Sequence, residues 1–374
     1  MQKKLIALAV AGLASSAAFA QSNVTIYGIA DIAYVHSSSG SSKTNGVDSG
    51  GWSSSRLGFK GTEDLGDGMK AVFTLEYGLA PDVNSGVGVT ATGGGNARQT
   101  WVGLQNSTGT IKLGRQNSLG KNGTDKYDAM ASTTFSPLYS VQRGNGVGTL
   151  AAPVAGSVFP HSLWTSGRLS NAVTFDSASI SGLVISAQYA FGGVSGDDTT
   201  TPAVGAAKKE STITIGGDYT MGDLGVNFIH QRSRDIADVA GNKASENFLG
   251  AAYNFGVAKL MGTFQTAQRT QTGVKFDTDK MWSLGVQVPV TAVGKVYFGY
   301  AKSNDGSVAQ NDFDSWGIQY SHELSKRTML YGGYQRLSND NLAKGTVLSN
   351  TGGRATVAAG ANTTGYGFGV RHTF

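Results

Sequence analysis

The chain has 374 residues, no cysteine and a formal net charge of +5 at pH 7. The lack of cysteine excludes a disulfide framework and a thiolate metal site. A basic chain could bind nucleic acid, but we find no basic run beyond Lys208-Lys209, no zinc-ligand spacing and no basic helix, so we expect no nucleic-acid partner. Glycine contributes 54 residues, roughly twice its usual share. A Gly-rich chain with a mean hydropathy of −0.14 fills a solid core poorly but can form a barrel with a wet interior.

The N-terminus has the pattern of a cleavable export signal. Lys3 and Lys4 precede an apolar run over 5–18, and Ala18-Phe19-Ala20 supplies the small residues that a signal peptidase requires. We therefore expect residues 1–20 to be a cleaved signal peptide and 21–374 to form one barrel domain. The alternative is an isolated amphipathic helix. No later stretch has the ~18 apolar residues that a membrane-spanning helix requires.

Alternation of apolar and polar residues predicts strands along nearly the whole remaining chain. In 70–77, Ala71, Phe73, Leu75 and Tyr77 share one face, and Lys70, Thr74 and Glu76 share the other. Repeating this reading predicts about sixteen strands, at roughly 23–36, 51–63, 68–80, 96–106, 109–116, 165–177, 182–192, 210–221, 224–236, 244–254, 257–269, 276–289, 294–303, 312–323, 327–338 and 361–374.

The connectors between these strands alternate between short and long. The long ones are at about 37–50, 81–95, 117–164, 193–209 and 339–360. This alternation is typical of an all-β transmembrane antiparallel barrel, whose sheet must close because lipid offers no partner to an edge. A soluble solenoid or sandwich is the alternative, but it would need regular repeats or two apolar inner faces. A connector as long as 117–164 is usually functional, and we expect it to fold into the lumen as a constriction loop.

Five segments carry a family resemblance, and they follow one another through the chain: 56–66, 98–104, 109–115, 324–328 and 369–374. In them the chain resembles the general trimeric porin family of Gram-negative bacteria, particularly its beta-proteobacterial branch. The resemblance implies sixteen strands, three barrels per assembly and a third extracellular loop folded into each pore. The partners it implies are outer-membrane lipid and lipopolysaccharide, the barrel-assembly machinery, and small hydrophilic solutes and ions.

Strand alternation indicates which charges face the lumen. On 56–60, Leu57 and Phe59 face lipid, so Arg56 and Lys60 face inward. On 96–104 we expect Trp101 outside, with Arg98 and Thr100 inside.

The strand at 168–176 gives a third inward arginine. There Leu169, Val173 and Phe175 should face out and Arg168 in. The resemblance places Arg56, Arg98 and Arg168 on the barrel wall at the constriction. Glu76 also faces inward by alternation, on the strand after Arg56, and the infolded loop offers Asp125 and Asp128 across from that wall. The channel set is therefore Arg56, Arg98, Arg168, Glu76, Asp125, Asp128 and Lys60.

Two further features concern assembly. Arg115 shares the outward parity of Ile111 and Leu113, so we expect it either at a subunit interface or extended from a strand end toward water. The last strand carries an outward apolar and aromatic edge that resembles the family's assembly signal, formed by Tyr366, Phe368, Val370 and Phe374.

We find no catalytic motif in the sequence, and the five histidines are far apart along the chain. We expect a passive diffusion channel for small hydrophilic solutes that needs no cofactor and weakly prefers anions. The preference should be weak because Ile29 and Asn96 stand where some relatives carry basic residues. An outer-membrane barrel hydrolase and a non-conducting surface adhesin are the alternatives, and conductance in a planar bilayer distinguishes them.

Overall fold

The computed structural model describes residues 23–89, 95–143, 167–191, 211–235, 240–271, 273–275, 277–304, 306, 311–347 and 355–374. The expected signal peptide lies outside these residues. The strands are β1 (Asn23–Ser39), β2 (Ser42–Ser49), β3 (Arg56–Gly66), β4 (Met69–Gly78), β5 (Ala97–Asn106), β6 (Gly109–Asn117), β7 (Arg168–Ser177), β8 (Leu183–Ala190), β9 (Ser211–Met221), β10 (Leu224–Arg234), β11 (Lys243–Asn254), β12 (Lys259–Gln271), β13 (Val274–Lys275), β14 (Asp279–Pro289), β15 (Gly294–Asn304), β16 (Phe313–Glu323), β17 (Thr328–Asn339) and β18 (Thr363–Thr373). The two helices are α2 (Leu119–Tyr127) and α3 (Pro137–Arg143), and within the described residues no helix is long and apolar enough to cross a membrane.

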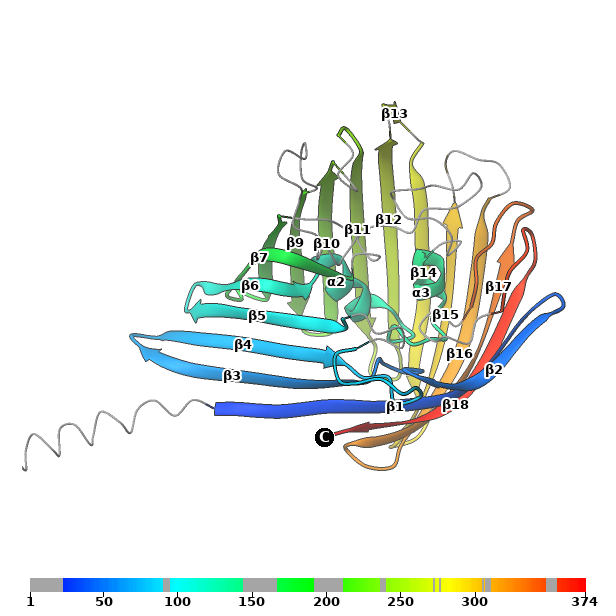
Figure 1. The fold of residues 1–374 in the computed structure, drawn as a ribbon, viewed down its shortest axis with the longest axis horizontal. Coiled ribbons are helices and arrows are strands. Elements are labelled where there is room, and N and C mark those ends of the chain that lie inside the picture. The colour runs from blue at the N-terminus through cyan, green and yellow to red at the C-terminus, as the bar shows by residue number, and fades with distance from the viewer. Residues whose placement is uncertain are drawn as a thin grey trace, which may run out of the picture.

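The strands form a closed antiparallel barrel of sixteen wall strands (Figure 1). β1 closes it, because residues 29–39 pair with β18 and residues 23–29 pair with β3. β2 pairs with residues 32–39 of β1, on the same edge of β1 along which β3 pairs with residues 23–29. β13 is a two-residue strand that pairs with the end of β12. The expected all-β barrel is therefore confirmed.

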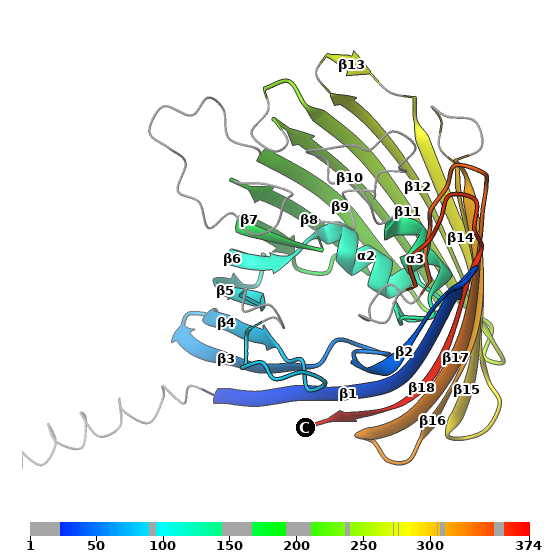
Figure 2. The ribbon, with the colours of Figure 1, turned by 45° about the vertical axis from the view of Figure 1, so that its right-hand side comes forward.

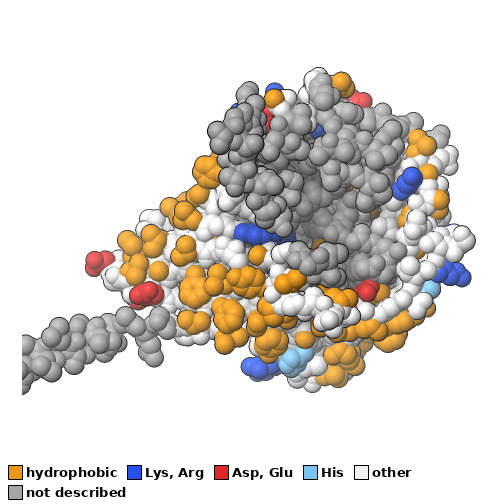
Figure 3. Space-filling view, viewed as in Figure 1, with side chains coloured by type: hydrophobic (Ala, Val, Ile, Leu, Met, Phe, Trp, Pro, Cys, Tyr) orange, Lys and Arg blue, Asp and Glu red, His pale blue; other side chains and the backbone are white. Residues whose placement is uncertain are grey.

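Every wall strand presents one face to lipid and one to the lumen. On β16, the outward Ile318 and Tyr320 are 44% and 39% exposed, whereas the inward Ser315 and Gln319 are buried. Hydrophobic side chains consequently gather over the outer wall in Figure 3. This distribution inverts that of a soluble protein and suits a strand with lipid on one side and water on the other.

One expected connector is instead a hairpin. Residues 37–50 were expected to be a long loop, but β1 continues to Ser39 and β2 returns antiparallel to it over Ser42–Ser49. Both strands of this extension are polar, so no alternation signals them. The sequence pattern therefore missed a strand whose exposed face, formed by Lys43, Asn45 and Val47, is mostly polar.

The described part of the loop after β6 folds inside the barrel, as expected. Figure 2 shows α2 and α3 within the ring of strands, where α2 contacts β9–β12 and α3 contacts β14–β16. Inward glycines allow this close approach. A Cβ on Gly317 would lie 2.6 Å from the Phe135 carbonyl oxygen, and one on Gly333 would lie 2.7 Å from the Phe135 ring. The loop thus lies directly against the far wall and narrows the lumen.

Candidate functional site

Glu76 is the centre of a charged cluster on the inner wall of β3–β5. Its Oε1 accepts a hydrogen bond from Arg98 Nε at 2.7 Å, and its Oε2 lies 3.8 Å from an Arg56 guanidinium nitrogen. Tyr27 donates its hydroxyl to the same carboxylate at 3.1 Å. Glu76 therefore shares a wall with the arginines and bridges two of them. This is the place expected for it, inward on the strand that follows Arg56.

Arg98 reaches this cluster because β5 has a bulge. Glu76 pairs with Gln99 but the next residue, Tyr77, pairs with Ala97, so Arg98 is an extra residue in its strand. A bulge reverses the alternation beyond it. Arg98 faces the cluster, as expected, but for a different reason.

The reversal makes the other two assignments on β5 wrong. Trp101 pairs with the inward Thr74, and its ring lies 5.6 Å from the Lys112 ammonium. Thr100 pairs with the exposed Leu75 and therefore lies on the lipid side.

Arg168 begins β7, opposite Asn117 at the end of β6. It interacts electrostatically with Arg98, Glu76 and Arg56, which brings the three expected arginines into one field. Its Nε is buried and has no hydrogen-bond partner among the described residues. The expected lipid-facing position of Leu169 is wrong, because Leu169 is fully buried and the strand is irregular at Asn171, where φ is +49°.

Lys60 lies on the same inner face, next to this cluster. It pairs with the inward Thr74, two residues from the Gly58 that pairs with Glu76. Its ammonium lies 5.4 Å from the Tyr27 ring centre. The side chain is exposed to the lumen, so it adds a solvated positive charge beside the Arg56–Glu76–Arg98 cluster.

Asp125 and Lys121 bring the constriction loop's own charges to the arginines. Both residues are on α2, one helical turn apart, and their side chains form an ion pair at 2.8 Å. Asp125 acts electrostatically on Arg56, while Lys121 interacts with Arg168 and Arg98. Burial lowers the pKa of Lys121, and Asp125 partly offsets that shift. The loop therefore presents an ion pair to the wall, not an acidic row.

Asp128 does not face the lumen, so its expected place opposite the arginines is wrong. The carboxylate is buried and accepts hydrogen bonds from Met130 N, Ser132 N and Ser136 Oγ at 3.0, 2.8 and 2.6 Å. Burial raises its pKa, and these bonds oppose the rise. Its role is to fix the turn between α2 and α3.

Arg371 is a site residue that the sequence reasoning missed. It pairs with the inward Asp31, and its Nε donates to Ser53 Oγ at 2.9 Å. It also interacts electrostatically with Arg56. Its parity, opposite to the outward Phe368 and Val370 neighbours, was the signal that could have identified it.

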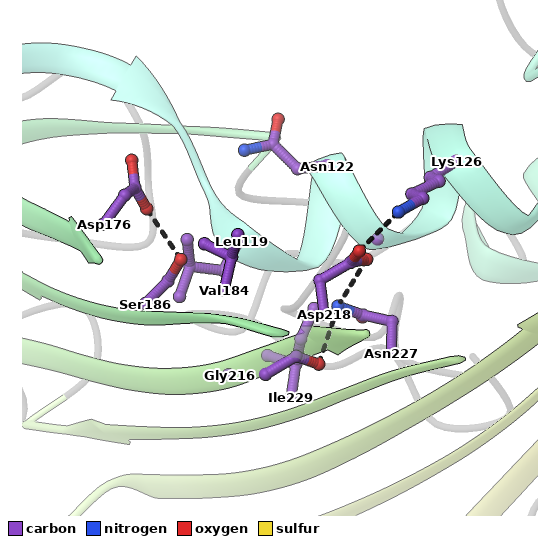
Figure 4. A pocket seen from close by; sticks show the side chains of 12 residues that line it. Leu119, Asn122, Lys126, Asp176, Val184, Ser186, Gly216, Asp218, Asn227 and Ile229 are labelled. Atoms are coloured by element: carbon purple, nitrogen blue, oxygen red, sulfur yellow. Dashed lines mark hydrogen bonds and ion pairs between the residues drawn. The ribbon is translucent and has the colours of Figure 1, made fainter. Parts of the chain in front are cut away.

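A cavity of about 270 Å³ lies between α2 and the wall strands β7–β10 (Figure 4). Lys126 forms an ion pair with Asp218, which also accepts from Asn227 Nδ2 at 3.2 Å. On the other side of the cavity, Asp176 accepts from Ser186 Oγ at 2.6 Å. The Lys126–Asp218 ion pair therefore fastens α2 to the wall.

Arg115 satisfies its charge within its own chain. Its Nε donates to the Ala97 carbonyl at 2.8 Å, and a terminal guanidinium nitrogen donates to Ser170 Oγ at 2.6 Å. It pairs with Thr100 on the lipid side, next to a register shift between Gly114 and Gln116. The neighbouring strands therefore provide hydrogen bonds to this guanidinium within one chain, and its place at a subunit interface or at a strand end stays a prediction.

The C-terminal residue completes the closure of the barrel. Phe374 exchanges two backbone hydrogen bonds with Gly28, at 3.0 and 3.2 Å. A Cβ on Gly28 would lie 2.2 Å from the Phe374 ring, so only glycine leaves room for the aromatic ring there. The outward edge of the same strand carries Tyr366, Phe368 and Val370, and Phe368 packs on Tyr34 with ring centres 5.5 Å apart.

A closed barrel with a lipid-facing apolar wall and a charged, loop-narrowed interior defines a membrane diffusion channel. A family model described as Gram-negative porin matches residues 7–342. The chain is 33% identical to outer membrane porin protein 32 of Delftia acidovorans over 388 residues, covering 100% of both chains. It is 27% identical to the major outer membrane protein P.IB of Neisseria meningitidis serogroup A, covering 88% of this chain and 91% of that protein.

Solved structures agree with these relatives. The anion-selective porin from Comamonas acidovorans superposes with a TM-score of 0.74 at 28% identity, covering 95% of this chain and 100% of that one. Salmonella typhi OmpF, at 15% identity and a TM-score of 0.64, shares the fold. The chain belongs to the Gram-negative porin family. It is an outer-membrane porin through which small hydrophilic solutes diffuse passively.

Proposed function

We propose that this channel weakly prefers anions. The observation that carries the proposal is the imbalance of charge at the constriction. Among the described residues, Arg56, Arg98, Arg168 and Lys121 interact with two lumen-facing acids, Glu76 and Asp125, which leaves an excess of two positive charges in this cluster. Lys60 adds to the excess on the same wall, whereas the charge of Arg371 is offset by the inward Asp31 with which it pairs. The printed description of the Comamonas acidovorans neighbour as anion-selective supports the same direction.

The preference should be weak because half of the cluster is internally paired. Arg98 is bonded to Glu76, and Lys121 to Asp125. Fixed charges in a narrow polar opening raise the local concentration of counter-ions and orient dipolar solutes. The guanidinium groups are always charged at physiological pH, so the sign of the field is constant.

The test is the reversal potential of the purified protein in a planar bilayer that separates two concentrations of potassium chloride. An anion-preferring channel gives a reversal potential with the same sign as the equilibrium potential of chloride in that gradient. A potential of the opposite sign would refute the proposal. The same experiment separates a porin from the two alternatives, since neither an adhesin nor a barrel hydrolase is expected to give stepwise conductance.

We further propose that the chain works without turnover or cofactor. Among the described residues, no group of three or more His, Cys, Asp and Glu could hold a metal ion. The polar groups that converge in the lumen are arginines and their paired acids, which suit transient contact with ions.

Assembly and export follow the family pattern in this proposal. We propose a homotrimer, inserted by the barrel-assembly machinery after cleavage of residues 1–20. The aromatic edge of β18 supports recognition of the last strand, because Phe374 and Phe368 lie on the lipid side where another protein could bind them.

The outer face supports binding of lipopolysaccharide. Within the described strands β10–β17, outward basic residues occur only near the strand ends that adjoin the long loops. They are Arg232, Arg234, Lys243, Lys280, Lys302 and Arg336. Aromatic pairs lie just below them, such as Trp282 with Tyr300 and Trp316 with Tyr334. At the short-turn end, the same faces carry residues such as Tyr253, Leu260 and Tyr320.

Long loops of such barrels face the exterior, so this basic band meets the phosphate groups of the outer leaflet. The test is native mass spectrometry of the detergent-extracted protein. Replacing Lys302 and Arg336 with Gln should reduce the retained lipopolysaccharide, while replacing the inward Lys259 and Lys295 should leave it unchanged. Equal retention in both double variants would refute this part of the proposal.

A further inference from the structure

Residues 50–55 form a short inward bend in the barrel wall, which we call the inner bend. It interrupts the strand formed by β2 and β3, both of which pair with β1. Gly50 opens it with φ at +88°, a conformation that favours glycine, and its N–H donates to the Asp31 carbonyl at 2.9 Å. The chain then enters the lumen before β3 resumes at Arg56.

One buried carboxylate holds the inner bend in place. Asp31 is 0% exposed, and its Oδ2 accepts the backbone N–H groups of Trp52 and Ser53 at 3.1 and 2.7 Å. Its Oδ1 accepts the hydroxyl of Tyr331 from β17. A buried carboxylate is costly unless it is hydrogen-bonded. Two of the three donors belong to the inner bend and the third to β17, which β18 separates from β1. Asp31 therefore connects the inner bend to β17.

The inner bend also holds the constriction loop. The Gly51 carbonyl accepts a hydrogen bond from Thr134 N at 3.0 Å, and Thr134 lies between α2 and α3. The Trp52 ring packs edge-on against Tyr297 and Tyr331, with ring centres 5.4 and 5.5 Å away. The bend therefore fills the space between the loop and the wall.

The same six residues position two arginines of the site. The Ser54 carbonyl accepts from Arg56 Nε, and Ser53 Oγ accepts from Arg371 Nε, both at 2.9 Å. Ser55 fixes the exit of the bend, since its hydroxyl bonds the Asp31 carbonyl at 3.0 Å and accepts from Asp31 N at 2.9 Å. One carboxylate thus orders a segment that touches two selectivity charges and the loop that narrows the pore.

We infer that Asp31 is a positioning residue for the constriction, acting through the inner bend and not by contact with the permeating ion. Loss of its charge weakens three hydrogen bonds at once and frees the bend. The Thr134 contact, Arg56 and Arg371 then lose a common support. The expected result is a constriction that fluctuates, with the barrel wall intact because the β1 pairings do not involve the Asp31 side chain.

The test is a single-channel recording of Asp31→Asn in planar bilayers. Asp279→Asn is the matched control, because Asp279 is also a buried inward carboxylate, lies 3.7 Å from Arg269, and takes part in none of the bend contacts described above. Asp31→Asn should increase open-channel current noise several-fold, lower the voltage at which the channel closes, and move the reversal potential toward zero. Asp279→Asn should leave the reversal potential as in the wild type.

Two further variants keep the inference falsifiable if Asp31→Asn does not fold. Tyr331→Phe removes one donor to the carboxylate and should raise the noise to a smaller extent. Ser53→Ala removes the Arg371 contact and should move the reversal potential without a change in trimer yield. Wild-type noise, closing voltage and reversal potential in these folded variants would overturn the inference. Such a result would leave the diffusion function itself untouched, since the wild type would still conduct.

Discussion

Arg98 Nε lies 2.7 Å from Glu76 Oε1, so the central base and acid of this porin stand on adjacent strands of one wall. Glu76 is therefore an internal neutraliser of the arginine cluster. The field across the lumen depends on how much of the arginine charge Glu76 cancels.

Glu76→Gln should strengthen anion preference. The substitution removes one negative charge while keeping the size of the side chain, and it frees Arg98 and Arg56 from their shared partner. The reversal potential should move further toward the equilibrium potential of chloride. The folded state should lose about 1–3 kcal/mol, the cost of leaving buried polar partners unsatisfied. An unchanged reversal potential would show that Glu76 does not act on the permeation path, and a movement toward cation preference would contradict its role as a neutraliser of the arginines.

Lys121 should make the selectivity sensitive to alkaline pH. Burial lowers its pKa, so Lys121 loses its proton below the pH at which an ordinary lysine does. Anion preference should therefore decline as the pH rises toward the usual lysine range, while the arginines remain charged. Lys121→Met should show a smaller preference at neutral pH and a flatter pH profile. Identical profiles for the variant and the wild type would contradict this assignment.

Deleting Phe374 should reduce assembly sharply. The residue contributes two backbone hydrogen bonds to Gly28 and an aromatic ring packed over it at the closing seam. Heat-modifiable oligomer in outer-membrane fractions is the measurement, and export across the inner membrane should be unaffected. Phe374→Tyr keeps the ring and serves as the control. Equal oligomer yield from the deletion and the control would mean that the terminal residue is dispensable.

The mature protein should begin at Gln21. Ala18 and Ala20 provide the small residues of a cleavage site. Intact mass of the protein from envelope fractions measures this directly. Ala20→Asp should block processing and leave the precursor mass. A wild-type protein that keeps residues 1–20 would contradict the export signal.

The wall strands were predictable because lipid imposes an apolar residue at every second position. The alternation on β16, with Ile318 and Tyr320 outward, is the kind of signal that recurs around the barrel. The exposed face of β2 is formed by Lys43, Asn45 and Val47, so apolar residues do not alternate along it. Prediction of strands therefore succeeded where apolar residues alternate along the outer face and failed where that face is mostly polar.

Site residues were harder to place because single-residue irregularities reverse parity. The bulge at Arg98 reversed the assignments of Thr100 and Trp101, and the irregularity at Asn171 displaced Leu169. The predicted position of Asp128 was wrong for another reason. Its hydrogen bonds lie within a non-periodic loop, whose conformation no alternation rule specifies.

The central claim is that the arginines inside the barrel set the ion preference, and one comparison tests it most directly. Arg168→Ser and Arg115→Ser remove the same charge a short distance apart, from the cluster side of β7 and the lipid side of β6. In a salt gradient across a planar bilayer, Arg168→Ser should raise conductance and move the reversal potential toward cation preference. Arg115→Ser should lower the stability of the barrel, because it removes the bonds to Ala97 and Ser170, and should leave the reversal potential near that of the wild type. An unchanged reversal potential in Arg168→Ser, or an equal shift in Arg115→Ser, would contradict the account.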